Sequence, residues 1–363
     1  MPVSEEAIGL IDQGRFDEAL PHYEAALSAD PDCPEAHFGI GQIHYLNRRV
    51  EQSLASFRRA WDLGVDLDRG AQERWMIFML LGRFERAWQE SDRVLRNRKN
   101  SGVDCRDWPL HFRFVWDGSP LAGKRVLIRC YHGLGDTIQF IRYAPLLKQI
   151  ASRVTVQVQA ELIPLLRSMG EIDELIPLAA STPEPRYDVD IESMELPHAF
   201  RTVPGTIPST VPYLRVETPP RTSREFRVGL VWTAGAWRPE RSVPLSEIAT
   251  LADIPNVIMY SLQRGPAMRQ SLFPDAGSDG ILEAAQAIAG LDLVISVDTM
   301  IPHLAGALGK PVWTLLHYHS DWRWMLNRSD SPWYPTMRLF RQPAPGDWSS
   351  VIEQVKRALK SPR

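Results

Sequence analysis

The sequence predicts an all-helical region followed by two α/β halves that face a common cleft. Three observations carry this prediction. Apolar positions recur with a fixed period in the first hundred residues, and short apolar strands alternate with helical segments from residue 125 onward. One of these strands runs directly into a polar turn that opens a helix. With 363 residues, the chain is long enough for two or three domains that each have a core.

The helical region consists of repeats. Phe16, Val50 and Phe84 are each separated by 34 residues, which is the period of tetratricopeptide helix pairs. The same spacing joins Leu20, Leu54 and Trp88, as well as Ala19, Ser53 and Ala87. We therefore expect residues 1–100 to form a tetratricopeptide-repeat domain with a concave surface for a peptide or another protein. Three roles remain open for these repeats: they could recruit a partner, form a dimerisation arm or act as a spacer.

The rest of the chain alternates strands and helices, which is the pattern of parallel sheets. Strands are expected at 125–130, 154–158, 175–178, 188–191, 226–232, 257–262, 293–297, 312–316 and 337–340. Helices are expected at 137–150, 162–169, 194–200, 245–251, 281–291, 301–308 and 348–359. A polar linker at 96–107 and a proline-rich link at 179–224 indicate domains at 101–222 and 223–363. Ligands of such folds bind between the strand carboxyl ends.

The strand at 293–297 leads into the first candidate site. Thr299, Met300 and Ile301 follow it at the start of a helix, so their amides and the positive end of the helix dipole favour an anion. His303 lies about one turn further and could add a donor. The alternative is a plain helix start, in which Asp298 or Thr299 is only the N-cap residue.

A second turn, Gly133-Leu-Gly-Asp136, follows the strand at 125–130 and should face the same cleft. Gly133 and Gly135 allow the backbone to turn tightly and to approach a ligand closely. Asp136 is also a suitable N-cap for the helix that begins here. By itself this turn predicts little about function.

Two longer motifs resemble known families. The stretch S-V-D-T-x-x-x-H-L-A-x-A-L-G-x-P, from Ser296 to Pro311, resembles the donor-binding signature of glycosyltransferases related to bacterial heptosyltransferases. The block from Trp116 to Tyr143, with Gly-Leu-Gly-Asp-Thr-Ile-Gln-Phe-x-Arg-Tyr at its end, resembles bacterial tetratricopeptide proteins that carry such a transferase. The resemblance implies the GT-B architecture of two Rossmann-like domains, an acceptor-side domain and then a nucleotide-sugar domain, with the last helix crossing back to the first.

The resemblance also assigns residues to a site. It implies that Asp136 is the catalytic base. Tyr131 and His132 replace the acidic and amide residues expected in these relatives, so His132 is a rival base on the same turn. It implies that the donor diphosphate is held by the turns at 133–135 and 296–300 and by His303 and Arg241. The residues expected to bind the donor are therefore Gly133, Gly135, Arg241, Ser296, Asp298, Thr299, Met300 and His303.

Further contacts are expected from the second half. Gln263 and Arg264 end a strand and could meet the base or the ribose, whereas Glu283 could accept the ribose hydroxyls. Trp322, Trp324 and Trp333 could line a sugar or base pocket, although a buried core is the commoner use of tryptophan.

Composition excludes several function classes. Lys plus Arg total 41 against 44 for Asp plus Glu, a formal charge of -3, so nucleic acid is not an expected partner. Cys33, Cys105 and Cys130 are too few and too scattered for a disulfide framework or a zinc site. Without an apolar leader or a span of membrane length, a cytoplasmic protein with no integral membrane segment is expected. Asp188-Val-Asp190 has the form of a metal-binding motif but belongs more simply to a strand.

These features together predict a metal-independent, inverting glycosyltransferase with no cofactor besides its nucleotide-sugar co-substrate. The acceptor would be a protein or a saccharide, and the repeats would recruit it or another protein partner. Two alternatives remain open: a non-catalytic tetratricopeptide scaffold with a vestigial transferase body, and a sugar-nucleotide epimerase.

Overall fold

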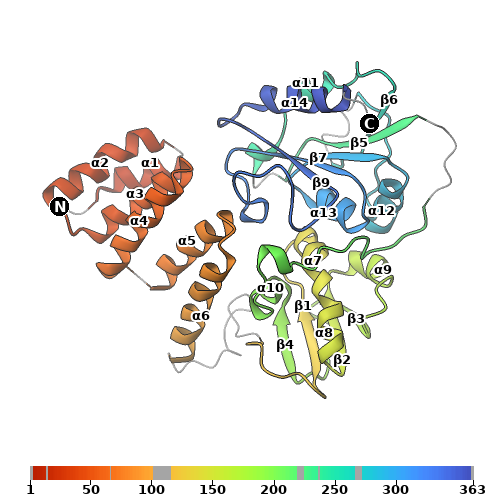
Figure 1. The fold of residues 1–363 in the computed structure, drawn as a ribbon, viewed down its shortest axis with the longest axis horizontal. Coiled ribbons are helices and arrows are strands. Elements are labelled where there is room, and N and C mark those ends of the chain that lie inside the picture. Colours follow the sequence, from red (N-terminus) through yellow and green to blue (C-terminus); the bar gives the residue numbers. More distant parts are fainter. Residues whose placement is uncertain are drawn as a thin grey trace. The chain divides into compact units, whose positions relative to one another are not determined.

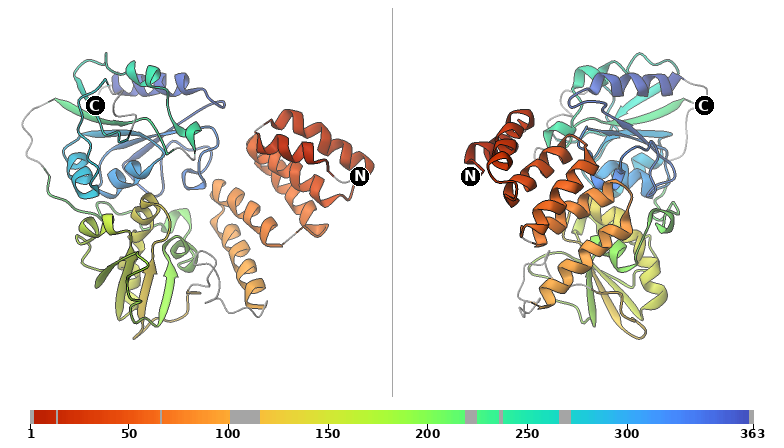
Figure 2. Two further views of the ribbon diagram at one scale, coloured as in Figure 1. Left: turned by 180° about the vertical axis from the view of Figure 1, so that it is seen from behind. Right: turned by 60° about the vertical axis from the view of Figure 1, so that its left-hand side comes forward.

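The computed structural model describes residues 3–13, 15–65, 67–100, 116–218, 225–235, 238–265 and 272–360. The chain forms two compact units (Figures 1 and 2). Unit 1 comprises Met1–Asp104 together with Asp321–Leu326, and unit 2 comprises Cys105–Ser320 and Asn327–Arg363. The second part of the expected linker, from residue 101 on, lies outside the described residues, as does Cys105.

Unit 1 is built from helix pairs, as the period predicts. Its helices are α1 (Glu5–Asp12), α2 (Phe16–Ala29), α3 (Pro34–Leu46), α4 (Val50–Asp62), α5 (Leu67–Leu80) and α6 (Phe84–Asn100), and each packs on the next. Phe16, Val50 and Phe84, which defined the period, are the first residues of α2, α4 and α6. The repeated apolar position therefore marks the start of the second helix in each pair.

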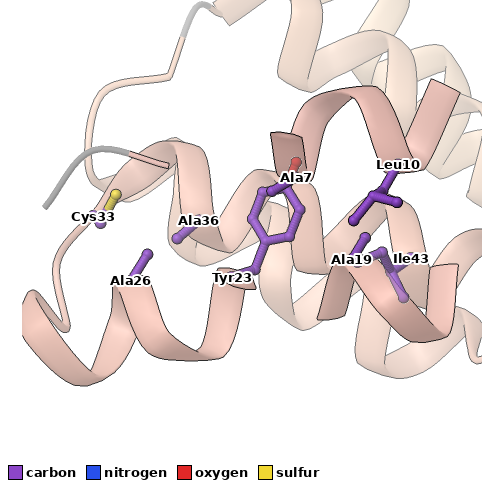
Figure 3. Packing of buried hydrophobic residues seen from close by; sticks show 8 residues of the cluster. All are labelled: Ala7, Leu10, Ala19, Tyr23, Ala26, Cys33, Ala36 and Ile43. Carbon is purple, nitrogen blue, oxygen red and sulfur yellow. The ribbon is translucent and has the colours of Figure 1, made fainter. Parts of the chain in front are cut away.

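Small side chains let these helices approach closely. In the first core cluster Ala7, Ala19, Ala26 and Ala36 are buried around the Tyr23 ring (Figure 3). Leu10, Cys33 and Ile43 complete this cluster. A second cluster continues along the array with Phe38, Phe57, Ala60 and Ile77.

The third helix pair is completed by a segment from far along the chain. The short helix η9 (Trp322–Trp324) packs on α5, where the Trp322 and Trp75 rings meet edge to face at 5.2 Å. The Leu326 amide donates to the Leu80 carbonyl at 2.8 Å. Trp322 and Trp324 are 5% and 0% exposed. Both tryptophans therefore belong to the core of unit 1, which is the alternative to a sugar or base pocket that the sequence left open.

The first sheet of unit 2 is entirely parallel, with the order β3-β2-β1-β4. Its strands are β1 (Arg125–Arg129), β2 (Arg153–Val158), β3 (Glu174–Pro177) and β4 (Val189–Glu192). The connecting helices are α7 (Leu134–Phe140), η3 (Ile141–Tyr143), α8 (Ala144–Ile150), η4 (Ala160–Leu162), α9 (Ile163–Leu166), η5 (Ser193–Glu195), α10 (Leu196–Ala199) and η6 (Pro204–Thr206). The expected helix at 137–150 is divided by η3.

The second sheet is also parallel and has the order β6-β5-β7-β8-β9. Its strands are β5 (Phe226–Val231), β6 (Val257–Ser261), β7 (Leu293–Val297), β8 (Val312–Leu316) and β9 (Met337–Arg341). Helices α11 (Leu245–Ala249) and α14 (Trp348–Lys360) lie on one face, and α12 (Ile281–Ala289) and α13 (Met300–Ala307) on the other (Figure 1). The short helix η7 (Pro239–Arg241) follows β5.

The last helix does not follow the expected path. Helix α14 packs mainly on α11 and β9 of the second sheet, instead of crossing to the first sheet. Trp348, Val351, Ile352, Val355 and Leu359 form its buried stripe. The second sheet, which contains β9, buries this apolar stripe, so α14 has no need to pack on the first sheet. In the described ranges, no helix has the length and hydrophobicity that a membrane span requires.

Candidate active site

The polar turn after β7 forms a capped helix start. Thr299 is the N-cap of α13, and its Oγ1 accepts a hydrogen bond from the Ile301 amide at 3.4 Å. Ser296 Oγ donates to the Val297 carbonyl at 2.8 Å and lies 3.5 Å from Thr299 Oγ1. Thr299 is thus an N-cap residue, as the alternative interpretation predicted. Its hydroxyl accepts from the Ile301 amide, which is one of the three amides expected to bind an anion. The dipole of α13 still points out of this edge of the sheet.

Arg241 brings a positive charge to the same turn. Its Nη1 donates to the Asp298 carbonyl at 3.0 Å. The Asp298 residue is only 7% exposed, so this hydrogen bond is formed in a largely dry environment. The guanidinium of Arg241 and the N-terminus of α13 therefore favour negative charge at one place.

The turn after β1 lies against the start of α13. Asp136 Oδ2 accepts from the Gly133 amide at 3.0 Å, which closes the first turn of α7. A Cβ on Gly135 would lie 3.2 Å from the His303 ring and 3.3 Å from the Met300 Cα. The α7 and α13 helices pack together in unit 2 (Figure 1). A side chain at 135 would thus be tightly packed between the two helix starts.

The His303 side chain is fixed from behind. It is 5% exposed, and its Nδ1 lies 3.0 Å from the Tyr334 hydroxyl. Burial raises the pKa of the Tyr334 phenol, so the group stays protonated at neutral pH. Gly306 allows this packing, because a Cβ there would lie 2.4 Å from the Tyr334 ring.

A buried arginine joins the two sheets behind this site. Arg142, in η3, donates to the Tyr213 hydroxyl at 3.0 Å and to the Trp333 carbonyl. Its guanidinium carbon lies 4.3 Å from the centre of the Tyr334 ring. Trp333 packs edge to face on Phe140 at 5.7 Å. Trp333 therefore belongs to the packing between the sheets, and the interpretation of this tryptophan as core is the one that holds.

His132 and a buried carboxyl group lie beside Asp136. His132 Nε2 is 3.7 Å from Glu192 Oε1, at the end of the neighbouring strand β4. Burial, followed by the charge of Glu195, raises the pKa of Glu192 to about 8. Sequence reasoning missed Glu192. The available signal was its position as the residue directly after the strand expected at 188–191, where parallel strands present functional side chains.

The remaining expected contacts use their polar atoms within the chain. Gln263 Oε1 accepts from the amides of Trp232 and Thr233 at 3.1 and 3.0 Å, so it holds the end of β5. Arg264 pairs with Asp275 at 2.6 Å. The Glu283 side chain is exposed in the first turn of α12, where it folds over Gly280. Gln263 and Arg264 follow β6, whereas Glu283 lies in α12.

The Asp188-Val-Asp190 motif is structural. Asp188 pairs with Arg125 at 2.8 Å and Asp190 with Arg129 at 2.7 Å. Within the described ranges, no group of three or more His, Cys, Asp or Glu side chains could hold a metal ion. His317, at the end of β8, is 4% exposed, and burial lowers its pKa to about 4.

Two parts of the chain match known families. Residues 5–64 match the family described as tetratricopeptide repeat, and residues 269–344 match that described as glycosyltransferase family 9 (heptosyltransferase). Protein FlbA of Caulobacter vibrioides is 23% identical over 432 aligned residues, which cover 98% of this chain and 72% of that protein.

Solved structures resemble the α/β part. The glycosyl transferase family 9 protein from Veillonella parvula DSM 2008 has a TM-score of 0.51 at 15% identity, covering 68% of this chain and 92% of that one. The E. coli heptosyltransferase WaaC with ADP-2-deoxy-2-fluoro heptose has a TM-score of 0.45 at 15% identity, over 64% and 99% of the chains. The predicted fold, a tetratricopeptide region followed by a GT-B type α/β region, is thereby confirmed.

Proposed function

We propose that this chain is an inverting, metal-independent glycosyltransferase that moves a sugar from a nucleoside diphosphate to an acceptor hydroxyl. Its relation to glycosyltransferase family 9 supports a glycosyltransferase. One observation supports the finer statement: the α7 start, with Asp136, packs on the α13 start, with Gly135 against Met300 and His303. A proton acceptor and an anion site thus belong to one place.

The donor side has the charge that a departing diphosphate needs. The N-terminus of α13 carries roughly half a positive charge, and Arg241 adds a guanidinium at Asp298. His303, held by Tyr334, lies within the first turn of the same helix. Donors that are already in place stabilise the negative charge as it develops, without reorganising at that moment. In this proposal the protein supplies that charge by itself.

The transfer is a single displacement. The acceptor oxygen bonds to the anomeric carbon while its proton passes to the Asp136 carboxylate. The bond from the anomeric carbon to the diphosphate breaks, and its electron pair leaves with the diphosphate. Attack from the face opposite the leaving group inverts the anomeric centre.

Replacement of the base tests this assignment. Asp136→Asn keeps a side-chain oxygen that can accept from the Gly133 amide, so the start of α7 should persist. We expect transfer to fall by about 100-fold or more, while calorimetry with ADP, UDP and GDP shows unchanged affinity. Arg241→Met is the matched variant, for which diphosphate affinity should fall. Parent-rate transfer by Asp136→Asn would reject Asp136 as the base.

The repeats are proposed to recruit a protein acceptor. In unit 1 a cavity of about 520 Å³ opens between α1 and α2. Glu6, Arg15, Glu18 and His22 contribute to its lining, so a polar peptide segment suits it. Glu6→Lys should raise the KM for the protein acceptor and leave nucleoside diphosphate affinity unchanged. Equal KM values for the parent and the variant would rule this cavity out as the recruiting surface.

A further inference from the structure

Two side chains at one edge of the second sheet are buried with polar atoms that are not hydrogen-bonded. His317 directly follows β8, and Gln342 directly follows β9. They are 4% and 2% exposed. Both ring nitrogens of His317 and the Nε2 of Gln342 lack a hydrogen-bond partner in the part of the chain that the structure describes. Such groups are rare because each destabilises the fold, so their presence together at one edge indicates a functional role.

Gln342 lies beside His317 because β8 and β9 are neighbouring parallel strands. Their pairing continues to this point, since the Gln342 amide donates to the Leu316 carbonyl at 2.9 Å. The side-chain Oε1 of Gln342 accepts from the amides of Tyr318 and Gly346 at 2.9 and 3.2 Å. These two bonds fix the carboxamide, because the opposite orientation would bring its NH2 group against two N–H donors. The Nε2 of Gln342 is therefore a donor with a fixed direction.

The start of α13 lies on the other side of His317. Val297 of β7 pairs with Leu315 of β8, and the backbone of Thr299 is still extended, with φ -144° and ψ -168°. The continued register brings Thr299, the N-cap of α13, level with His317 on the neighbouring strand. Neighbouring strands lie about 4.8 Å apart. The unpaired nitrogens of His317 thus belong to the same edge as the proposed anion site.

The His317 ring is neutral and therefore has one donor and one acceptor nitrogen. Burial, the largest cause, lowers the pKa of His317 to about 4. The charges of Arg238 and Arg241 act in the same direction, and that of Glu240 opposes them. Arg241 also donates to the Asp298 carbonyl at 3.0 Å, so it connects the surroundings of His317 with the turn after β7. A phosphate oxygen would only accept, whereas a hydroxyl group can both accept and donate.

We propose that His317 and Gln342 form a subsite for hydroxyl groups of the nucleotide sugar whose diphosphate binds at the start of α13. This inference rests on the proposed function and extends its donor site from β7 to β8 and β9. A hydroxyl group accepts from Gln342 Nε2 and donates to the unprotonated nitrogen of His317. Among the described residues none is hydrogen-bonded to the His317 ring, so the ring can turn toward a ligand without losing a bond.

Removal of the ring nitrogens tests the subsite. In His317→Phe an apolar ring replaces unpaired polar atoms, so the melting temperature should equal or exceed that of the parent. Calorimetry with UDP-glucose, ADP-glucose and GDP-mannose should show affinities that are about tenfold lower. A loss for the nucleotide sugars alone assigns the subsite to the transferred sugar, whereas an equal loss for UDP, ADP and GDP assigns it to the ribose. Parent-like affinity for every ligand would overturn the proposal.

Thr314→Val is the matched control. Thr314 is 0% exposed and its Oγ1 is also buried without a partner among the described residues, but it lies inside β8 and not at its end. This variant should bind every ligand as the parent does. An equal loss of affinity in Thr314→Val would attribute the effect to β8 as a whole and contradict the subsite.

Gln342→Glu is the second variant, and it decides if His317→Phe does not fold. It keeps an oxygen for the amides of Tyr318 and Gly346 but replaces the NH2 donor by a second acceptor. The affinity for the same ligands should again fall about tenfold. Affinities equal to those of the parent would show that Gln342 Nε2 binds no hydroxyl group.

Free sugars separate failure of the subsite from failure of the transferase function. If the parent binds none of the nucleotides, the transferase function is rejected, and D-glucose and D-ribose then test the subsite by itself. Each should shift the ¹⁵N resonances of the His317 ring in the full chain, and His317→Phe assigns these resonances. His37, in α3 of unit 1, should show no shift. An unchanged His317 spectrum with both sugars would reject the subsite as well.

Discussion

At the scale of single residues, Glu192 shows how burial determines a protonation state that composition does not reveal. Its carboxyl group is neutral at pH 7 because burial and neighbouring acids raise its pKa to about 8, from an ordinary value of 4.5. By contrast, burial, followed by smaller effects of neighbouring charges, lowers the pKa of His317 to about 4. The two groups make the stability of unit 2 depend on pH in opposite directions.

The stability of the parent should fall between pH 5.5 and pH 7.5 because of Glu192. Its folded pKa lies above the unfolded one, so its contribution is complete below about pH 4.5 and is lost as pH rises toward 8. The loss in unfolding free energy amounts to at most about 1.4 kcal/mol per pH unit. Glu192→Gln should remove this contribution, so that urea denaturation at the two pH values shows only the opposite dependence that His317 gives below pH 6.5.

Glu195→Gln is the matched control for this prediction. The side chain of Glu195 is 45% exposed, and its charge is the second cause of the shift at Glu192. Removal of that charge should reduce the slope without abolishing it. If the parent and Glu192→Gln have the same slope, Glu192 is ionised in the folded protein at neutral pH.

At the scale of elements, the contact between α7 and α13 is the most specific feature of the site. Gly135 is the point where the helices meet, since its missing side chain leaves room for Met300 and His303. Gly135→Ala should therefore push the two helix starts apart. We expect nucleoside diphosphate affinity to fall about tenfold, the scale of modest overpacking, as measured by calorimetry with ADP, UDP and GDP.

Gly170→Ala provides the comparison for Gly135→Ala. Nothing lies within 4 Å of a Cβ at Gly170, so this variant should bind like the parent. Reduced affinity in both variants would point to a general effect of replacing glycine. Parent-like affinity in Gly135→Ala would mean that the helix starts can separate without affecting the anion site.

The sequence predicted elements better than their partners. The strand at 293–297 has the predicted bounds, because both its ends are marked by polar residues. The helix at 137–150 has unbroken apolar spacing, yet η3 divides it where Arg142 turns toward Trp333 and Tyr213. Periodicity records which face is buried, but it does not record what covers that face. For the same reason the packing of α14 on its own sheet was not foreseen.

In the candidate site, too, the sequence predicted the positions of residues better than their partners. Asp136, Met300 and His303 could be grouped in advance, because strand carboxyl ends and helix starts meet at one edge. Gln263 could not be placed, since its side-chain oxygen accepts from backbone amides of another strand end. Such partners are distant in sequence, and nothing in the composition of either segment identifies them.

At the scale of the whole molecule, unit 1 is not a single continuous stretch of the chain. Asp321–Leu326 belongs to unit 1, although the residues on both sides of it belong to unit 2. A terminal repeat leaves one apolar face without a neighbouring repeat, and solenoid proteins cover such faces with a capping element. Trp322, packed on Trp75 of α5, has this role here.

Trp322→Ala should therefore destabilise the third helix pair. Loss of a buried tryptophan ring costs about 3–5 kcal/mol, and the loss should appear as faster amide hydrogen exchange in α5 and α6. Trp348→Ala is the matched variant, because Trp348 is buried to the same 5% exposure but lies in α14 of unit 2. Its effect should be confined to the second sheet. If exchange in α5 is as slow in Trp322→Ala as in the parent, the segment at 321–326 does not cap the repeats. The third helix pair would then be stable through its own contacts, among them the buried ion pair of Arg74 and Glu90.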